Sequence, residues 1–327
     1  MRLRKRSNNG SGAGETTLYF ATDLHGSEVC FRKFVAAAAF YRADLLVLGG
    51  DLTGKLVTPI VDRGDGTWAV EQHGVSRVHK TRDLEALERQ LADEGIYSCR
   101  IDRERNAELE RDPAQVDTLF RELMLERLAH WIDLAHERLA ESGVRIITAP
   151  GNDDPYEVDD LIRERGGDRV VLMEGEVTEI APGHEMLSTG WSNHTPWNTH
   201  REFDEPVIRE HIDAMASRLV HPEAAIFNIH VPPYGTGLDD APELDADLKP
   251  VQGGNVMKPV GSTAVRDAIL KHQPMLALHG HIHESRGIQK LGRTICINPG
   301  SVYGEGILQG VIVELGMDEV RYSLTTG

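Results

Sequence analysis

TTLYFATDLHG at residues 16–26 and DLLVLGGD at residues 44–51 are the two stretches of sequence that decide the fold. Each begins with a run of apolar and β-branched residues, which is typical of a buried strand, and each ends in a polar loop that contains glycine. The segment from 28 to 41 between them has helical spacing. This strand, helix, strand order predicts a parallel sheet whose strands are buried on both faces.

Three further apolar runs predict buried strands, at residues 145–149, 225–229 and 275–278. Polar residues follow each of these strands at its carboxyl end, which is where open α/β sheets bind their ligands. Helical spacing predicts one long helix over 113–142 and shorter helices near 157–165 and 206–220. The remaining pattern predicts antiparallel strands at 170–180 and 185–190, and short strands joined by turns over 287–324.

Charge and composition exclude several classes of protein. The 327 residues include 52 acidic and 35 basic side chains, for a formal net charge of -17, which argues against a nucleic-acid or membrane surface. Three widely spaced cysteines fit neither a disulfide framework nor a Cys-x-x-Cys motif. No stretch approaches the ~18 uninterrupted apolar residues of a membrane span. We therefore expect a cytoplasmic protein that has no membrane partner; the sequence does not specify an oligomeric state.

Two segments stand apart from the expected core, which we assign to a single domain over 15–327. Residues 1–14 are basic and rich in Gly, Ser and Asn, so we expect a solvated, disordered tail rather than a nucleic-acid-binding arm. Residues 57–111 make the connection after Asp51 too long for one crossover. We interpret them as an insertion built from a hairpin around Asp65-Gly66 and a helix, which forms a cap or a partner-binding subdomain.

Five short motifs follow the predicted buried strands in chain order. They are Asp23-Leu-His25, Gly50-Asp51, Gly151-Asn152-Asp153-Asp154, the single His230, and Gly280-His281-Ile-His283. Each motif alone is weak, because a Gly-Asp pair is usually a turn and a lone histidine is usually structural. Together they bring oxygen and imidazole ligands to one edge of the predicted sheet, which favours a metal site.

The order, spacing and residue types of these motifs resemble those of the calcineurin-like metallophosphoesterases. The similarity extends from residue 23 to residue 283 and leaves the 57–111 insertion outside it. The resemblance implies an α/β fold, a four-layered αββα sandwich of two mixed β-sheets flanked by helices. It also implies a phosphoester hydrolase that uses two divalent metal ions and a metal-bridging water or hydroxide as the nucleophile.

Carried over by position, the resemblance implies seven metal ligands. Asp23, His25 and His283 would hold the first ion; Asn152, His230 and His281 would hold the second; and Asp51 would bridge the two. A shared carboxylate offsets the repulsion between two ions that lie about 3.5–4 Å apart. Imidazole and carboxylate ligands without cysteine suit Mn, Fe, Zn, Ni or Co better than Mg or Ca.

The chain departs from the family pattern at one position. Asp153 stands where the family usually has a histidine that protonates the leaving group or stabilises the transition state. An aspartic acid has an intrinsic pKa of about 3.9, so it is a poor acid near pH 7 unless burial or a neighbour such as Asp154 raises that pKa. Asp154 either orients the site or caps the next helix. Lys55 either contacts a substrate phosphate or is a solvated loop residue.

The functional hypothesis is a phosphoesterase with a small phosphoester substrate and with Asp51, Asn152 and Asp153 as its catalytic residues. Phosphodiesters are slightly favoured over monoesters because of Asp153. One alternative is a non-catalytic interaction scaffold that uses the 57–111 insertion as its contact surface. A nuclease is a further alternative, which the net charge of -17 disfavours.

Overall fold

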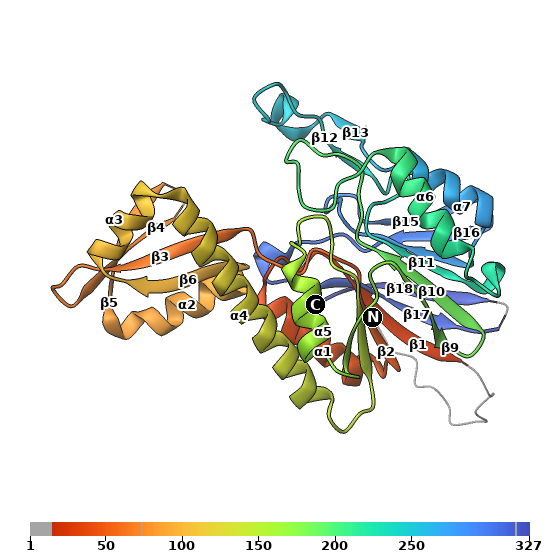
Figure 1. The fold of residues 1–327 in the computed structure, drawn as a ribbon, viewed down its shortest axis with the longest axis horizontal. Coiled ribbons are helices and arrows are strands. Elements are labelled where there is room, and N and C mark those ends of the chain that lie inside the picture. The colour runs from red at the N-terminus through yellow and green to blue at the C-terminus, as the bar shows by residue number, and fades with distance from the viewer. Residues whose placement is uncertain (1–14, 73, 318) are drawn as a thin grey trace.

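Two six-stranded mixed sheets form the centre of the molecule (Figure 1) in a computed structural model that describes residues 15–72, 74–317 and 319–327. The tail predicted for residues 1–14 lies outside the described residues. The first sheet has the order β18-β17-β1-β2-β7-β8, made of Val320–Thr326, Gln309–Leu315, Thr16–Ala21, Leu45–Leu48, Arg145–Thr148 and Val170–Leu172. The second has the order β15-β16-β14-β11-β10-β9, made of Gly287–Leu291, Thr294–Asn298, Leu276–Leu278, Ile226–Ile229, His184–Thr189 and Glu176–Ala181.

Four adjacent strands of each sheet run parallel, and the other two strands pair antiparallel with their neighbours. In the first sheet β1, β2, β7 and β8 run parallel, whereas β17 and β18 are antiparallel. In the second sheet β10, β11, β14 and β16 run parallel, with β9 and β15 antiparallel at the two edges. The parallel strands therefore all end at the same edge of their sheet, which is where the predicted ligands follow.

Helices cover the outer face of each sheet, so the protein has four layers. Helices α1, α4 and α5 (Glu28–Tyr41, Pro113–Leu139 and Glu157–Arg165) share a hydrophobic core with the first sheet. Helices α6 and α7 (Glu205–Ala216 and Thr263–His272) share another with the second sheet. A third core fills the space between the sheets. The predicted αββα sandwich is confirmed.

Side-chain alternation along the strands creates these layers. In β1, Leu18 and Phe20 enter the core between the sheets, whereas Tyr19 and Ala21 enter the core under the helices. Successive side chains of a strand point to opposite faces, so a strand that is apolar at every position must be covered on both faces. The continuous apolar runs of the sequence therefore correspond to the strands at the centre of each sheet.

Residues 56–111 form a separate small layer beyond α4 (Figure 1). Its four-stranded sheet has the order β5-β4-β3-β6, and it carries the helices α2 and α3. The bounds are Val75–Lys80, Thr67–Gln72, Leu56–Asp62 and Ile96–Ile101 for the strands, and Leu84–Asp93 and Arg103–Arg111 for the helices. The apolar side of α2 packs on β3 and β4 through a core of Ile60, Val70, Leu84, Leu87 and Leu91. A second small hairpin elsewhere joins β12 (Asp240–Pro242) and β13 (Met257–Pro259).

The turn between α2 and β6 docks tightly on the loops that follow β1 and β2. A Cβ atom added to Gly54 would lie within 3.0 Å of the Gly95 carbonyl oxygen, and one added to Gly95 would lie equally close to the carbonyl oxygen of His25. The Tyr97 hydroxyl accepts a 2.7 Å hydrogen bond from the Gly54 backbone N–H. Tyr97 itself belongs to the core under the first sheet. The small layer is thus packed against the backbone of the predicted metal-binding loops.

In the described residues, none of the helices is both long and apolar enough to span a membrane.

Replacing Tyr97 with phenylalanine tests this docking. Tyr97→Phe leaves the Gly54 N–H buried without its acceptor, and we expect the free energy of unfolding to fall by about 1–3 kcal/mol. Chemical denaturation measures the change. Tyr322→Phe on the exposed face of β18 is the matched control, expected to stay within about 0.5 kcal/mol of the wild type. If Tyr97→Phe were as stable as Tyr322→Phe, the hydrogen bond between Gly54 and Tyr97 would not stabilise the docking of the small layer.

Candidate metal centre

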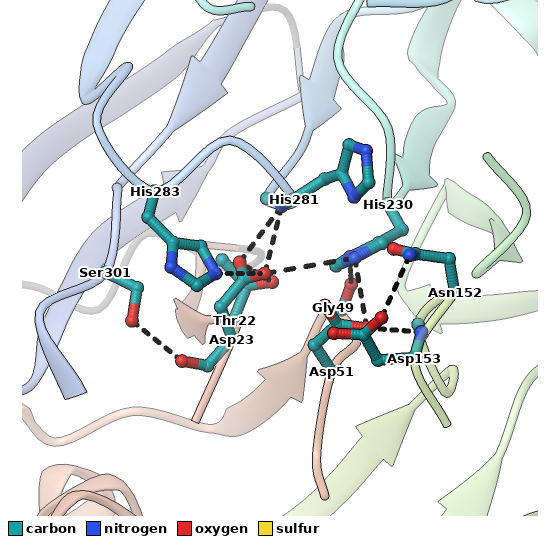
Figure 2. Close-up of polar contacts among 12 residues, drawn as sticks. Thr22, Asp23, Gly49, Asp51, Asn152, Asp153, His230, His281, His283 and Ser301 are labelled. Atoms are coloured by element: carbon teal, nitrogen blue, oxygen red, sulfur yellow. Dashed lines mark hydrogen bonds and ion pairs between the residues drawn. The ribbon is translucent and has the colours of Figure 1, made fainter. Parts of the chain in front are cut away.

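The predicted ligands lie on loops at the carboxyl ends of parallel strands, and both sheets contribute. Asp23 and His25 follow β1, Asp51 follows β2, and Asn152 follows β7 in the first sheet. The second sheet contributes three histidines, His230 after β11 and the pair His281 and His283 after β14. Figure 2 shows His230 and His283 of the second sheet directed toward Asp23 and Asp51 of the first. Residues from five separate segments therefore meet where the two sheets face each other.

Backbone hydrogen bonds extend each sheet into its loops. The N–H groups of Asp23 and His25 donate to the carbonyl oxygens of Gly50 and Asp51, at 2.9 and 3.0 Å. In the second sheet the Gly280 N–H donates to the His230 carbonyl oxygen at 2.8 Å. These bonds hold each ligand loop against a loop from the neighbouring strand.

Four of the predicted ligands have a left-handed backbone. The φ angles are 55° at Asp23, 42° at His25, 48° at Asp51 and 66° at His281. Each such residue costs on the order of 1–3 kcal/mol and persists only where its surroundings hold it. Residues under this strain cluster at functional sites, so their coincidence with the predicted ligands supports a site here.

Glycines next to the ligands let side chains from other loops approach. A Cβ atom would lie within 3.0 Å of the His230 ring if added at Gly50, of the Asp51 carboxylate at Gly151, and of the Asp23 carboxylate at Gly280. Real Cβ atoms do not make contacts this close. The glycine of each motif is therefore required by a ligand from a different motif.

The first group of potential ligand atoms belongs to Asp23, His25, Asp51 and His283, all within 4.8 Å of one another. The Nε2 atoms of His25 and His283 lie 3.1 Å apart. His283 Nε2 lies 3.3 Å from Asp23 Oδ1, and His25 Nε2 lies 3.5 Å from Asp51 Oδ2. This set of two carboxylates and two imidazoles is suited to a divalent transition metal.

The second group contains Asp51, His230 and His281, again within 4.8 Å. His230 Nε2 lies 3.4 Å from Asp51 Oδ1. Asp51 is therefore common to both groups, and its two carboxylate oxygens face different histidines. The Asp153 N–H donates to Asp51 Oδ1 at 3.1 Å and helps to orient this shared carboxylate (Figure 2).

The side chain of Asn152 is oriented so that its amide oxygen is available. Thr199 donates its hydroxyl proton to Glu202 at 2.6 Å, so the Thr199 oxygen must accept the 2.8 Å hydrogen bond from Asn152 Nδ2. A further bond joins Asn152 Nδ2 to Asp153 Oδ1 at 3.3 Å. Asn152 Oδ1 is buried and has no hydrogen-bond partner among the described residues. An unpaired buried oxygen is costly, and a metal ion would satisfy it.

Two of the histidines have a fixed orientation. The Nδ1 atom of His230 lies 3.0 Å from the Gly49 carbonyl oxygen, and the Nδ1 atom of His25 lies 3.3 Å from that of Thr53. A carbonyl oxygen can only accept, so each Nδ1 carries the proton. Nε2 is then the atom that each ring presents to the site.

Burial and mutual charge set the protonation of the site. Burial lowers the pKa of His25 to about 3 and that of His281 to about 4, so both rings are neutral at pH 7. Burial alone would also lower the pKa of His230, but the carboxylates of Asp51 and Asp23 raise it to about 10. Against the opposite effect of burial, His230 and His25 hold the pKa of Asp51 well below its ordinary value. The site therefore contains two ionised carboxylates in need of positive charge.

Asp153 lies at the edge of the site and forms an ion pair with Lys55. Lys55 Nζ lies 2.5 Å from Asp153 Oδ2. Burial and the charge of Asp51 raise the pKa of Asp153 to about 6, while Lys55 opposes the rise. Asp153 is thus still mostly ionised at pH 7, despite its burial.

Asp154 orients the loop of Asp51 and does not cap the next helix. Its carboxylate accepts hydrogen bonds from the backbone N–H groups of Leu52, Thr53 and Gly151 at 2.7–3.0 Å, and from the Thr53 hydroxyl at 2.7 Å. Helix α5 begins three residues later, and its N-cap position is Tyr156. Asp154 therefore joins the Gly-Asp and Gly-Asn motifs.

Sequence reasoning did not identify three residues that support the ligands. Thr199 accepts a hydrogen bond from Asn152 and is itself held by Glu202, and the centroid of the Tyr303 ring lies 4.7 Å from that of His25 and 5.9 Å from that of His283. Thr199 and Glu202 belong to an irregular loop, and Tyr303 follows the Asn298-Pro-Gly-Ser301 turn. None of the three falls in a motif or a periodic pattern that would distinguish it.

Comparisons with known proteins agree with the fold. No protein-family model matches the sequence. The uncharacterised protein MJ1162 of Methanocaldococcus jannaschii is 32% identical over 168 residues, which are 50% of this chain and 68% of that protein. The crystal structure of TT1561 of Thermus thermophilus matches 94% of this chain and 98% of its own with a TM-score of 0.52 and 14% identity. A more remote match, with a TM-score of 0.44 and 11% identity over 95% of this chain and 98% of its own, is a dimetal phosphatase from Danio rerio.

A methyl group at Gly151 should displace the shared carboxylate. Because the Cβ atom of Gly151→Ala would collide with the Asp51 side chain, we expect loss of most of the bound metal, measured by elemental analysis after dialysis against Mn²⁺. Gly304→Ala is the control, since a Cβ there meets no atom within 4 Å. If Gly151→Ala bound as much metal as the wild type, the close contact between Gly151 and the Asp51 carboxylate would not be needed for metal binding.

The affinity for metal should rise with pH up to about 10. His230 has a pKa of about 10 in the folded metal-free protein, above the ordinary value of 6.5, so below pH 10 a metal ion must displace its proton. By the same linkage, the stabilisation of the metal-free protein by this proton is complete below pH 6.5 and is lost as the pH rises to 10. Titration calorimetry at pH 8 in buffers of different ionisation enthalpy should detect proton release on metal binding. Binding without proton release would contradict the charged state of His230.

Proposed function

We propose that the chain is a member of the calcineurin-like metallophosphoesterase superfamily and a phosphoester hydrolase that works with two divalent metal ions; its ligand motifs and its fold support the proposal. The observation that carries the proposal is the position of Asp51. Its two carboxylate oxygens face two groups of histidines that come from different loops. A carboxylate shared in this way is the requirement for placing two cations close together.

The residues of each group fit one ion. Asp23, His25 and His283 would hold the first ion; His230, His281 and the unpaired oxygen of Asn152 would hold the second; and Asp51 would bridge them. The imidazole and carboxylate donors favour Mn, Fe, Zn, Ni or Co. Two such ions supply Lewis acidity, which offsets the negative charge of phosphoryl oxygens and lowers the pKa of water.

The protein's own contribution is to orient these donors and to exclude water. Asp154 and the Asp153 N–H fix the loop and the carboxylate of Asp51, and the Thr199 hydroxyl fixes the amide of Asn152. Asp23 and Asp51 are only 1% and 2% exposed, so the field of a bound cation would be poorly screened by solvent. Preorganised donors of this kind require little rearrangement when the substrate binds.

A small phosphoester is the substrate that we propose. A pocket of about 520 Å³ lies beside the centre and is lined by His283, Arg286, Tyr303 and Glu305 among others.

The net charge of -17 disfavours nucleic acid as the substrate, and with it the nuclease alternative. The pKa of Asp153 is about 6 in the metal-free protein because of burial and the charge of Asp51. Bound cations would offset that charge and lower the pKa again, so Asp153 would be a poor proton donor, which favours esters with stable leaving groups. Phosphodiesters therefore stay slightly ahead of monoesters, and a cytoplasmic location remains a prediction.

A non-catalytic scaffold is the alternative from another functional class. The small layer of residues 56–111 would be its contact surface. The filled ligand positions and their strained backbone argue against it, because a protein that no longer binds metal gains nothing from that strain.

A hydrolysis screen of metal-loaded protein tests the proposal. Purified protein is analysed for metal, stripped with a chelator, reloaded with Mn²⁺, and assayed with aryl phosphomonoesters and phosphodiesters. We expect close to two ions per chain, and turnover that disappears on stripping and returns on reloading. Protein that binds neither Mn²⁺ nor Zn²⁺ would contradict the enzyme and favour the scaffold.

Asp51 and Asp153 should differ in their importance despite having the same side chain. Asp51→Asn removes the shared negative charge, and we expect it to abolish both the binding of two ions and turnover. Asp153→Asn should keep its metal and lose far less than the ~10²–10⁴-fold that a working general acid contributes. Metal content and kcat/KM for aryl and alkyl esters measure both effects. If Asp153→Asn is as inactive as Asp51→Asn while retaining its metal, Asp153 is a proton donor after all.

A further inference from the structure

Lys55 is held beside the predicted metal centre by a rigid backbone. It follows Leu52, Thr53 and Gly54, whose N–H groups donate to Asp154 and to the Tyr97 hydroxyl at 2.7–3.0 Å. All three of these residues are buried. The position from which the Lys55 side chain leaves the loop is therefore fixed on both sides, by the main body and by the small layer of residues 56–111.

The side chain of Lys55 bends over the centre while remaining half open to solvent. Its Nζ atom lies 2.5 Å from Asp153 Oδ2, and its side chain is 48% exposed. The charge of Lys55 acts on Asp51, His25 and His283. The lysine is thus within electrostatic reach of the ligands while about half of its side chain stays open to solvent.

The ion pair with Asp153 leaves Lys55 free to take a second partner. An ammonium group has three N–H donors, and a carboxylate oxygen at 2.5 Å uses one of them. The Lys55 side chain is about half exposed, so its other donors can bind a second partner while the ion pair with Asp153 is kept. A phosphate oxygen is a suitable second partner, because lysine binds phosphate as a point charge on a flexible stem.

We propose that Lys55 is a substrate-binding residue whose ammonium group contacts the phosphoryl oxygens, and that Asp153 holds it in place for this contact. The proposal rests on the hydrolase function proposed above and adds a protein cation to the cations of the metal centre. Asp153 is then a positioning residue. Because the contact is made to the phosphoryl group, it acts alike on substrates with different leaving groups and also on inorganic phosphate.

Binding of inorganic phosphate to Mn²⁺-loaded protein tests this contact without depending on turnover. Lys55→Met keeps the length of the stem and removes the charge, and we expect it to keep its metal and to weaken phosphate binding on the order of 10- to 100-fold. Lys55→Arg should recover part of that loss. Lys290→Met, on the exposed surface of β15, is the matched control and should bind phosphate as the wild type does.

Kinetics with aryl and alkyl esters provide the second measurement. We expect Lys55→Met to lower kcat/KM by the same factor for both. A loss confined to alkyl esters would mean that Lys55 acts on the leaving group, and loss of metal would mean that it stabilises the centre; either result overturns the assignment. If Lys55→Met is active and binds phosphate as tightly as the wild type, the role of Lys55 is overturned but the proposed hydrolase function is not. A wild-type protein that holds Mn²⁺ but neither hydrolyses esters nor binds phosphate overturns the proposed function with it.

Discussion

The burial of two ionised carboxylates in one small space is the constraint on which the rest of the structure depends. Asp23 and Asp51 are nearly inaccessible to water, and their mutual repulsion in a medium of low dielectric requires positive charge between them. In the metal-free protein the imidazolium of His230 supplies part of that charge. The two sheets contribute opposite parts of this arrangement, since the carboxylates follow strands of the first and three of the histidines follow strands of the second. Charge balance at the centre therefore contributes to holding the two sheets together.

The sequence predicted the parts of the fold that depend on local patterns. Continuous apolar runs predicted β1, β2, β7, β11 and β14, because a strand buried on both faces has no polar side. The segment 170–180, predicted as one strand, is two: β8 belongs to the first sheet and β9 to the second, with Gly175 at a φ of 71° between them. Strand β6 was not predicted at all, since its pairing with β3 joins segments about 40 residues apart. Pairings of this kind depend on tertiary packing, which propensity does not contain.

The candidate site could be predicted to a similar extent. Each motif that carries the seven ligand positions was weak alone, but the order of the motifs along the chain and their place after predicted buried strands were informative together. The contacts around them were not predictable. The approach of Lys55 to Asp153, the hydrogen bonds that fix Asn152 through Thr199, and the use of Asp154 as a tie between two loops all join residues 47 to 102 positions apart. Such contacts follow from how the loops pack, and no single segment encodes them.

The glycines of the ligand loops have a consequence for how this sequence can change with time. Gly50, Gly151 and Gly280 are each required by a side chain from another motif, so none can be replaced while its neighbour remains a ligand. The ligands in turn are constrained by function. Substitutions at these positions must therefore occur in a fixed order, ligand first and glycine second. A descendant of this chain that had lost its metals would be free to accumulate side chains at the three glycines, and larger residues there would mark the loss of the centre even where some histidines survived.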